Sequence, residues 1–189
     1  MAVPPTPKAA LRRELRDRRD RAVAAMSPAE QSDAAAALAQ RLVPLVSPSG
    51  IVAAYIAIGS EIDPMPLIAA LAATGCSIAL PRVTAREAAM QFAPWSPGTP
   101  LSAGPFGLRQ PAADVPEIVP GVILAPLLGF DAMRNRIGYG AGFYDRAFAR
   151  FPAARRIGLA WAMQACEAIP TDPWDIPLEA IATEKAWHA

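Results

Sequence analysis

The stretch IVAAYIAI, residues 51–58, is apolar at odd and even positions alike. A strand covered on one face alternates between apolar and polar residues, so this pattern predicts a strand buried on both faces, as in a parallel sheet. Asp63 and Pro64 then suit the cap and first turn of a helix that ends near Thr74. A second apolar run, residues 76–83, follows this helix. The strand–helix–strand order predicts a right-handed crossover, which is the unit of an α/β sheet.

Apolar runs of the same kind recur along the chain. They predict buried strands at residues 121–130 and 156–162, and short strands at 90–93 and within the tail 169–187. Further helices are expected at residues 8–25, 28–43 and 143–151. The second of these begins with a capping box formed by Ser27 and Glu30, and a turn is expected at residues 47–50. This alternation predicts a single three-layer α/β/α domain over residues 1–189, with a mostly parallel, Rossmann-like sheet. The Pro-rich residues 1–7 are expected to be flexible.

The composition excludes several classes of protein. The 189 residues are 53% hydrophobic, which is ample for a full core. Their net charge is +1, so no overall field draws the chain to nucleic acid or membrane. Cys76 and Cys166 lack the spacing of metal ligands and are expected to be buried, reduced thiols. No signal-peptide core is visible and no apolar run approaches the ~20 residues of a membrane helix, so we expect a soluble cytoplasmic protein without a membrane partner.

The first predicted helix is crowded with arginines, at positions 12, 13, 16, 18, 19 and 21. Such a run could serve as a nucleic-acid-binding arm. Glu14, Asp17 and Asp20 interleave with it, which favours a solvated helix face with ion pairs three or four residues apart. We therefore expect most of these arginines at the surface and no nucleic-acid partner.

The segment RIGYGAGFYDR, residues 136–146, carries three alternating glycines. It lies between the end of a predicted strand and the start of a predicted helix, where α/β proteins place phosphates. Glycine lets backbone amides approach an anion without a β-carbon, and Arg136 could add a forked, permanent charge. The pattern matches neither the P-loop nor the dinucleotide fingerprint. A tight turn packed under aromatic side chains is the other interpretation.

Two acidic residues bear on this choice. Asp145 lies in the first turn of the predicted helix, where it would repel a bare phosphate but could share a magnesium ion with one. Alternatively, the helix dipole favours Asp145, or Asp145 pairs with Arg146. Asp175 lies just after Thr171 and Asp172, and capping that turn would be its default role.

The longer segment LLGFDAMRNRIGYGAGFYDR, residues 127–146, resembles the signature of the 5-formyltetrahydrofolate cyclo-ligase family. The likeness runs through most of the chain. It includes an N-terminal lysine with an arginine four residues on, Lys8 and Arg12. It also includes YIAIGSEID (55–63), LPR (80–82), PFG (105–107), GLAWAMQ (158–164) and IPTDPWDIPLEAIATE (169–184).

The resemblance implies an enzyme that uses ATP and Mg²⁺ to convert 5-formyltetrahydrofolate to 5,10-methenyltetrahydrofolate, ADP and phosphate. In the scheme it implies, ATP phosphorylates the formyl oxygen, N10 of the folate attacks the activated carbon, and phosphate departs. The protein must then align the formyl oxygen with the γ-phosphate and neutralise charge. The partners implied are small molecules, and the usual state of the family is a monomer. The alternative is a relative that binds folate or nucleotide without catalysis, or that accepts another ligand.

Site residues follow from the same resemblance. It implies catalytic roles for Arg136, Tyr144 and Asp145, and magnesium binding by Asp145 and Asp175. It implies ATP binding by Lys8, Arg12, Arg136, Ile137, Gly138, Tyr139, Gly140, Ala141, Gly142, Phe143 and Tyr144. It implies folate binding by Ile56, Glu61, Phe106, Tyr139, Gly140, Ala141, Gly142 and Phe143. Arg82 and Gln164 also match, without an assigned role.

The chain departs from the family pattern at four positions: Arg134 replaces a glycine, Ala141 a Gly or Lys, Phe143 a Tyr, and Gln110 a Glu. A methyl group at position 141 would alter the fit to a ligand if that position required a positive φ. These departures bear on substrate affinity more than on reaction class, because none removes a charged group that the reaction requires.

Overall fold

The computed structural model of the chain describes residues 6–46 and 50–189. Its centre is a seven-stranded sheet in the order β11-β10-β9-β6-β1-β2-β3. These strands are β1 (Ile51–Ala53), β2 (Ser77–Arg82), β3 (Gln91–Pro94), β6 (Val122–Pro126), β9 (Arg155–Leu159), β10 (Ala180–Ala182) and β11 (Trp187–His188). Pairing is parallel from β10 through to β2, and only the edge strands β3 and β11 pair antiparallel. The mostly parallel α/β sheet predicted from the sequence is confirmed.

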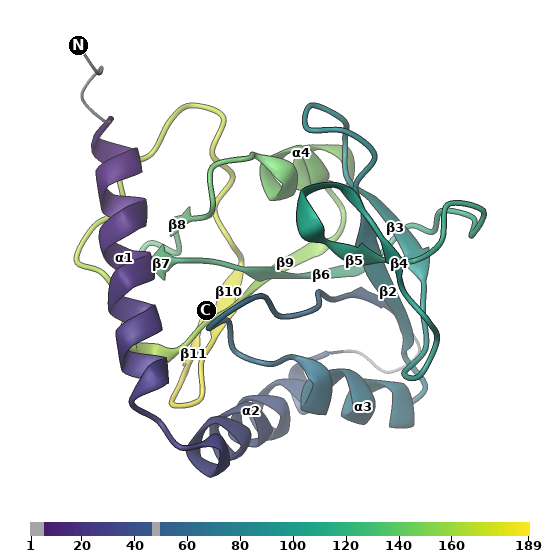
Figure 1. Cartoon of the computed structure of the whole chain (residues 1–189), viewed down its shortest axis with the longest axis horizontal. Helices are drawn as coiled ribbons and strands as arrows, with labels where there is room; N and C mark the ends of the chain where they lie inside the picture. Colours follow the sequence, from purple (N-terminus) through teal and green to yellow (C-terminus); the bar gives the residue numbers. More distant parts are fainter. Residues whose placement is uncertain (1–5, 47–49) are drawn as a thin grey trace.

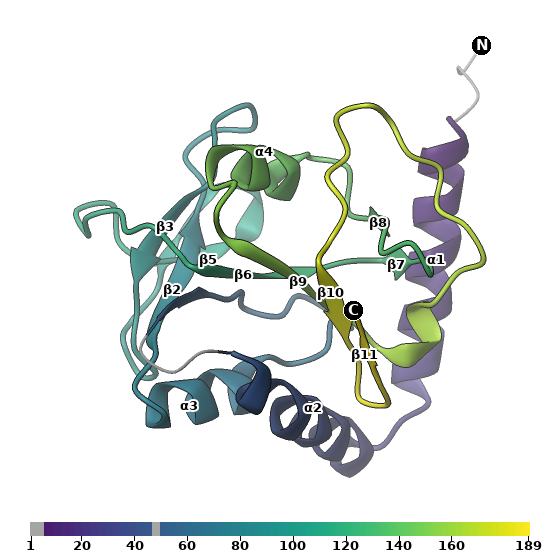
Figure 2. The ribbon, with the colours of Figure 1, turned by 180° about the vertical axis from the view of Figure 1, so that it is seen from behind.

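Helices cover both faces of this sheet, as Figures 1 and 2 show. The helices α2 (Pro28–Leu42) and α3 (Met65–Ala73) cover one face, and α4 (Phe143–Arg150) covers the other. Each face buries its own apolar cluster, with Leu38 and Leu71 in the first and Phe148 in the second. The predicted capping box is present at the start of α2, since Ser27 and Glu30 each accept the other's backbone amide. The three predicted layers are therefore confirmed.

The first helix, α1 (Pro7–Ala24), stands apart from these layers and lies along the edge where the parallel strands end (Figure 1). Its N-cap is Thr6, whose hydroxyl accepts the amide of Ala9 at 3.3 Å. Leu15, only 2% exposed, packs with Leu128 and Ile137 beyond the end of β6. Because sites of α/β proteins gather at the carboxyl ends of the strands, α1 brings its side chains to the functional edge of the sheet.

The strands predicted at 51–58, 76–83, 121–130 and 156–162 are all shorter in the structure, and two of them differ most. The first keeps only Ile51–Ala53 as a strand, and the chain then enters a loop across which the Tyr55 hydroxyl donates to the carbonyl of Ile62 at 2.9 Å. The second, residues 121–130, is divided into β6 and a separate strand, β7 (Gly129–Phe130), which pairs antiparallel with β8 (Arg136–Ile137). A β-carbon at Gly129 would lie 2.6 Å from Leu15, so glycine at this position permits the close approach to α1.

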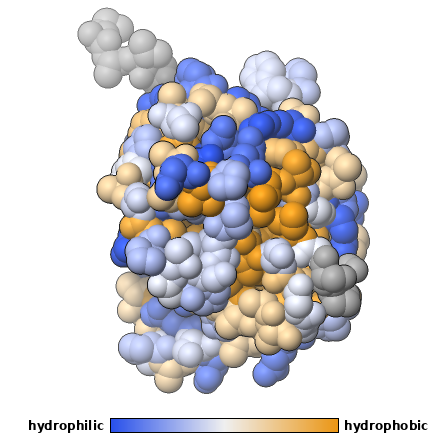
Figure 3. All heavy atoms as spheres, turned by 90° about the vertical axis from the view of Figure 1, so that its right-hand side faces the viewer, coloured by the Kyte–Doolittle hydropathy of each residue, from blue (hydrophilic) through white to orange (hydrophobic). Residues whose placement is uncertain are grey.

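Two short pieces of sheet were not predicted. One is the hairpin of β4 (Ser102–Ala103) and β5 (Arg109–Gln110), and the other is β11, while the strand β8 that pairs with β7 was not predicted either. Each strand has two residues, which is too short for an alternating pattern to be recognised. Figure 3 views the side of the molecule where β3 ends the sheet, and apolar residues form a band there between polar ones. Part of this edge is closed, since the amide of Ile118 donates to Phe92 at 2.8 Å.

Some expectations fall on segments that the structure does not describe, namely residues 1–5 and 47–49. These segments hold most of the N-terminal stretch expected to be flexible and most of the turn expected at 47–50. Thr6 and Pro7 are described, as the N-cap and first residue of α1. Among the described helices, none combines the length and the apolar character needed to cross a bilayer.

Candidate active site

The alternating glycines form the loop between β8 and α4, which we call the glycine loop (residues 138–142). Gly140 and Gly142 have φ values of +93° and +68°, in the region that glycine favours. Ala141 is not among the described residues with positive φ, so its methyl group causes no backbone strain. Within the described part of the chain, no backbone amide of the loop donates a hydrogen bond. The loop therefore presents free N–H groups next to the start of a helix, which is an arrangement suited to an anion.

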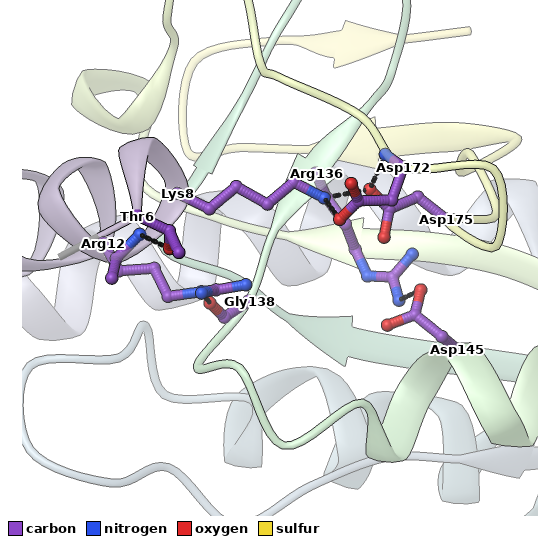
Figure 4. A network of polar contacts seen from close by, with 9 residues as sticks. Thr6, Lys8, Arg12, Arg136, Gly138, Asp145, Asp172 and Asp175 are labelled. Carbon is purple, nitrogen blue, oxygen red and sulfur yellow. Dashed lines mark hydrogen bonds and ion pairs between the residues drawn. The ribbon is translucent and has the colours of Figure 1, made fainter. Parts of the chain in front are cut away.

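Two cations of α1 face this region (Figure 4). The Nε of Arg12 donates to the carbonyl of Gly138 at 3.0 Å, which fixes α1 against the glycine loop. The Nζ of Lys8 donates to Asp172 at 2.6 Å and also to Asp175. The structure thus brings together residues from both ends of the chain and the glycine loop between them.

Arg136 lies at the centre of the site, and its side chain is 6% exposed. One nitrogen donates to Asp145 at 2.6 Å and another to the carbonyl of Ile176 at 2.7 Å. Its guanidinium also lies 4.6 Å from the centre of the Phe148 ring. The ion pair considered for Asp145 with Arg146 is wrong, since Asp145 pairs with Arg136 and Arg146 donates to the carbonyl of Ala141 at 3.0 Å.

Asp175 combines two interactions. Its carboxylate accepts the amide of Asp172 at 2.8 Å, as expected of a turn cap, and also accepts Lys8. Burial alone would raise the pKa of Asp175, but the bonds from Lys8 and Asp172, with the charges of Lys8 and Arg136, leave that pKa below its ordinary value. Burial lowers the pKa of Lys8, and its two carboxylate partners outweigh that effect and leave it raised. The charged forms of both residues are therefore favoured.

The carboxylates around Arg136 are ligands of the kind that a magnesium ion takes. Asp145 and Asp175 flank Arg136 in Figure 4, and Arg136 and Asp175 line a recess too narrow to hold a water molecule, together with Asn135, Thr171, Ile176 and Pro177. No group of three or more His, Cys, Asp or Glu residues gathers into a metal site in the described part of the chain. Magnesium does not need such a cage, because it is commonly held by one or two carboxylates together with phosphate oxygens and water.

Glu61 lies on the other side of the glycine loop and is 9% exposed. One carboxylate oxygen accepts the hydroxyl of Tyr139, and the other accepts the amide of Ile58 at 2.9 Å. Burial raises the pKa of Glu61 above its ordinary value, although these two hydrogen bonds and the charge of Arg19 oppose the rise. Each oxygen keeps a further lone pair that can accept an N–H group of a ligand.

The remaining predicted residues surround the same loop. Phe106 is 59% exposed, and its ring lies 6.0 Å from that of Phe143 at the loop's end. Tyr144 packs against Phe148, and burial, followed by the charge of Glu61, raises the pKa of its phenol. Ile137 is buried beneath α1, and Ile56 packs against the core on the side of α2 and α3.

The structure also shows site residues that the sequence did not reveal: Arg19, Ser60 and Asp172. The expectation of surface arginines is wrong for Arg19, which is 3% exposed and bonded to Ser60 and Tyr139. The sequence did contain a signal for Arg19, because Lys8, Arg12 and Arg19 are spaced by four and seven residues and therefore share one face of the helix.

Arg82 and Gln164, which matched without an assigned role, hold the fold together. Arg82 donates to three carbonyls of the loop at residues 112–115. Gln164 donates to the carbonyl of Leu127 at 2.6 Å and accepts the amide of Trp161 at 2.8 Å. Both side chains are thus used in fixing loops next to the sheet.

Known proteins resemble the chain over nearly its whole length. The model of the 5-formyltetrahydrofolate cyclo-ligase family matches residues 5–184. The 5-formyltetrahydrofolate cyclo-ligase of Escherichia coli (strain K12) is 31% identical over 174 residues, which cover 87% of this chain and 96% of that protein.

Solved structures show the same likeness. The NMR structure of Aquifex aeolicus 5,10-methenyltetrahydrofolate synthetase has a TM-score of 0.77 at 28% identity, covering 94% of this chain and 92% of that one. A 5,10-methenyltetrahydrofolate synthetase from Mycoplasma pneumoniae has a TM-score of 0.74 at 23% identity, covering 95% and 99%. The second likeness, at this lower identity, bears on the fold alone.

Proposed function

Because the chain belongs to the 5-formyltetrahydrofolate cyclo-ligase family, we propose that it converts 5-formyltetrahydrofolate to 5,10-methenyltetrahydrofolate with ATP and Mg²⁺, releasing ADP and phosphate. The family shows that the chain is an enzyme of the cyclo-ligase class. What we propose in addition is that it uses ATP, that it uses Mg²⁺, and the order of the chemical steps. The single-domain organisation and the cytoplasmic location expected from the sequence, and the monomeric state implied by the resemblance, stay predictions.

The proposed reaction has two steps. The formyl oxygen attacks the γ-phosphorus of ATP, and ADP leaves with the electrons of the broken P–O bond. N10 of the folate then attacks the activated formyl carbon, its proton is lost, and the carbon–oxygen bond breaks to release phosphate. The protein itself forms no covalent bond with substrate, so its task is to align two ligands and balance charge.

The phosphates of ATP are assigned to the glycine loop and the cations around it. The free amides of the loop support this assignment, together with Arg12, whose guanidinium already contacts Gly138. Lys8 and Arg136 would exchange part of their contacts with aspartates for phosphate oxygens. Arg136 supplies the fork that suits two phosphate oxygens at once.

Asp145 and Asp175 would hold the magnesium ion, because they are the oxygen ligands flanking Arg136. When bound, the ion supplies positive charge that neutralises the phosphates and orients them for transfer. The aspartates' present partners, Arg136 and Lys8, keep them charged and in place.

The folate is assigned to the side of the glycine loop that carries Glu61, Tyr139 and Phe143. The two carboxylate oxygens of Glu61 can accept amino and ring N–H groups of a pterin, a pairing that carboxylates make well. The exposed ring of Phe106, beside that of Phe143, offers an apolar face for the rest of the ligand. Tyr144 lies near enough for the charge of Glu61 to affect its phenol.

The convergence of Lys8, Arg136, Asp145 and Asp175 beside a loop of free amides carries the proposal. The test is a spectrophotometric assay, since the methenyl product absorbs in the near ultraviolet and the formyl substrate does not. We expect product to form only when ATP, Mg²⁺ and 5-formyltetrahydrofolate are all present. Folded protein that binds folate or nucleotide but gives no product would indicate the alternative, a relative without this catalysis.

A further inference from the structure

Arg19 is a buried cation that the proposed reaction does not use. It comes from the last third of α1, and its side chain is 4% exposed. The Nε donates to the hydroxyl of Ser60 at 2.7 Å, and Nη1 donates to the hydroxyl of Tyr139 at 2.9 Å. Ser60 in turn donates to Asp20, so the guanidinium is bound on two sides by groups that have partners of their own.

The phenol of Tyr139 links Arg19 to Glu61 through two hydrogen bonds. Its oxygen accepts from Arg19, and its proton is donated to the carboxylate. A hydroxyl that accepts a hydrogen bond from a cation becomes a stronger donor, so the two bonds reinforce each other. The resulting chain of three side chains joins α1, the glycine loop and the loop after β1.

We propose that Arg19 is a positioning residue for the folate site, which acts through Tyr139 and Ser60 to hold the Glu61 carboxylate in its orientation and in its ionised, hydrogen-bond-accepting form. This inference rests on the proposed binding of folate by Glu61. Ser60 is the residue before Glu61, so the bond from Arg19 to the Ser60 hydroxyl also ties the loop that carries Glu61 to α1. The carbonyl of Ser60 is held from the far side by the indole N–H of Trp161 at 2.9 Å.

The charges around Glu61 support this role. The groups that face it or its partners are Arg16, Arg19 and Asp20 from α1, Tyr55 and Asp63 from the loop after β1, Tyr139 from the glycine loop and Tyr144 from α4. Arg16 lies over the ring of Tyr139, at 5.2 Å from its centre, and Arg19 is the cation whose charge lowers the pKa of Glu61. Burial already raises the pKa of Glu61, so loss of the Arg19 charge would raise it further and leave the carboxyl protonated over a wider pH range.

The first experiment uses the ligand-free protein, labelled with ¹³C at the side-chain carboxyl of glutamate. Glu61 is assigned from the signal lost in Glu61→Gln, and its titration is followed by NMR in wild type, Arg19→Gln, Arg19→Lys and Tyr139→Phe. We expect the pKa of Glu61 to rise in Arg19→Gln, and to rise less in Arg19→Lys because the charge is kept. A titration of Glu61 unchanged by Arg19→Gln and by Tyr139→Phe would overturn the inference.

The second experiment measures turnover across the pH range of that titration. In Arg19→Gln we expect KM for 5-formyltetrahydrofolate to rise about tenfold at the acid end and less at the alkaline end, as for the loss of one charge-assisted hydrogen bond. KM for ATP should stay near the wild-type value. Equal changes in both KM values at every pH would mean that Arg19 merely supports the fold, and would contradict the positioning role.

Two control variants distinguish an effect of the Arg19 contacts from a general loss of charge or of folding. Arg13→Gln removes the same charge from an exposed position of α1 and should leave both KM values unchanged. Tyr139→Phe breaks the chain while Arg19 stays in place, so the inference can be tested even if Arg19→Gln folds poorly. If Glu61→Gln binds folate normally, the proposed role of Glu61 fails, while the NMR titration still decides whether Arg19 controls this carboxyl.

Discussion

Lys8 and Asp175 are joined by a hydrogen bond although they are 167 residues apart in the chain. Lys8 lies in the first turn of α1, and Asp175 lies in the segment that leads to β10. The contact pairs a cation proposed to bind phosphate with an acid proposed to bind magnesium. Each charge therefore has a partner of opposite sign, since Lys8 also contacts Asp172, and neither charge is buried alone.

This pair makes the stability of the fold depend on pH. The pKa of Asp175 is below its ordinary value of 3.8, so the pair's contribution is present above about pH 4 and is lost as pH falls through the lowered pKa. The pKa of Lys8 is above 10.5, so its contribution is present below that pH and is lost as pH rises through the raised pKa. We expect Asp175→Asn to flatten the acid limb of a plot of urea midpoint against pH.

Lys8→Met provides the matched control for this experiment. It should weaken both the acid and the alkaline dependence. Adding Asp175→Asn to it should change the urea midpoint by less than the same substitution does in wild type, because the contact with Lys8 is already lost and only the Asp172 amide and the Arg136 charge still act on Asp175. Additive effects of the two substitutions would show that the pair is not the source of the pH dependence.

Asp145→Asn should reduce turnover with little effect on the fold. The amide keeps the shape and can still contact Arg136, but it removes the negative charge proposed to bind Mg²⁺. We expect kcat to fall about 10²-fold and the Mg²⁺ concentration for half-maximal rate to rise. The melting temperature should stay near that of wild type, because the Asp145 side chain is 29% exposed. Normal turnover at an unchanged Mg²⁺ requirement would show that the metal assignment is wrong.

Arg136→Ala should raise the ATP requirement, because it removes the forked cation beside the glycine loop. It should also lower stability, since the bond to Ile176 and the contact with Phe148 are lost. Arg136→Lys keeps the charge without the fork, and we expect an ATP KM about tenfold above wild type for it, with a larger increase for Arg136→Ala. Titrations of ATP at saturating folate measure this, and an ATP dependence unchanged in both variants would count against phosphate binding.

Much of the fold was predictable, because buried parallel strands and helix caps have strong local signals. The doubly apolar run at residues 51–58 and the capping box of Ser27 and Glu30 both indicated elements that the structure contains. The ends of strands were less predictable. Residues 55–58 are largely as apolar as the strand before them, yet they leave the sheet and form a loop across which the Tyr55 hydroxyl bonds to Ile62, which is a tertiary interaction with no local signal.

Some residues of the candidate site could be predicted from the sequence and others could not. Motif resemblance pointed to Lys8, Arg136, Asp145 and Asp175, which do converge in the structure, and their functional roles stay predictions. It did not point to Arg19, because a run of arginines interleaved with acids has the appearance of a solvated helix. Burial of one member of that run depends on which face of α1 packs against the glycine loop, and that is decided by partners more than 40 residues away in the chain.

Arg134 is one of the positions at which the sequence departs from the family pattern, and the structure shows how the turn accommodates it. It replaces a glycine in the family pattern, and its φ is +62°, so the turn keeps the left-handed geometry without glycine. Asp131 compensates, since its carboxylate accepts the amides of Met133 and Asn135 at 3.0 and 2.9 Å and thereby holds the turn.

The glycine loop offers the sharpest test of the phosphate assignment, through Gly140→Ala with Gly138→Ala as its matched control. At Gly140 the φ is +93° and an added β-carbon would lie 3.3 Å from the Arg12 guanidinium, whereas at Gly138 nothing lies within 4 Å and φ is not in that region. We expect Gly140→Ala to cost about 1–3 kcal/mol of stability and to raise KM for ATP, while Gly138→Ala stays within about 0.5 kcal/mol. Urea unfolding and ATP titration measure both effects. Equal ATP affinity in the two variants, once both are shown to be folded, would mean that the loop amides do not bind the nucleotide.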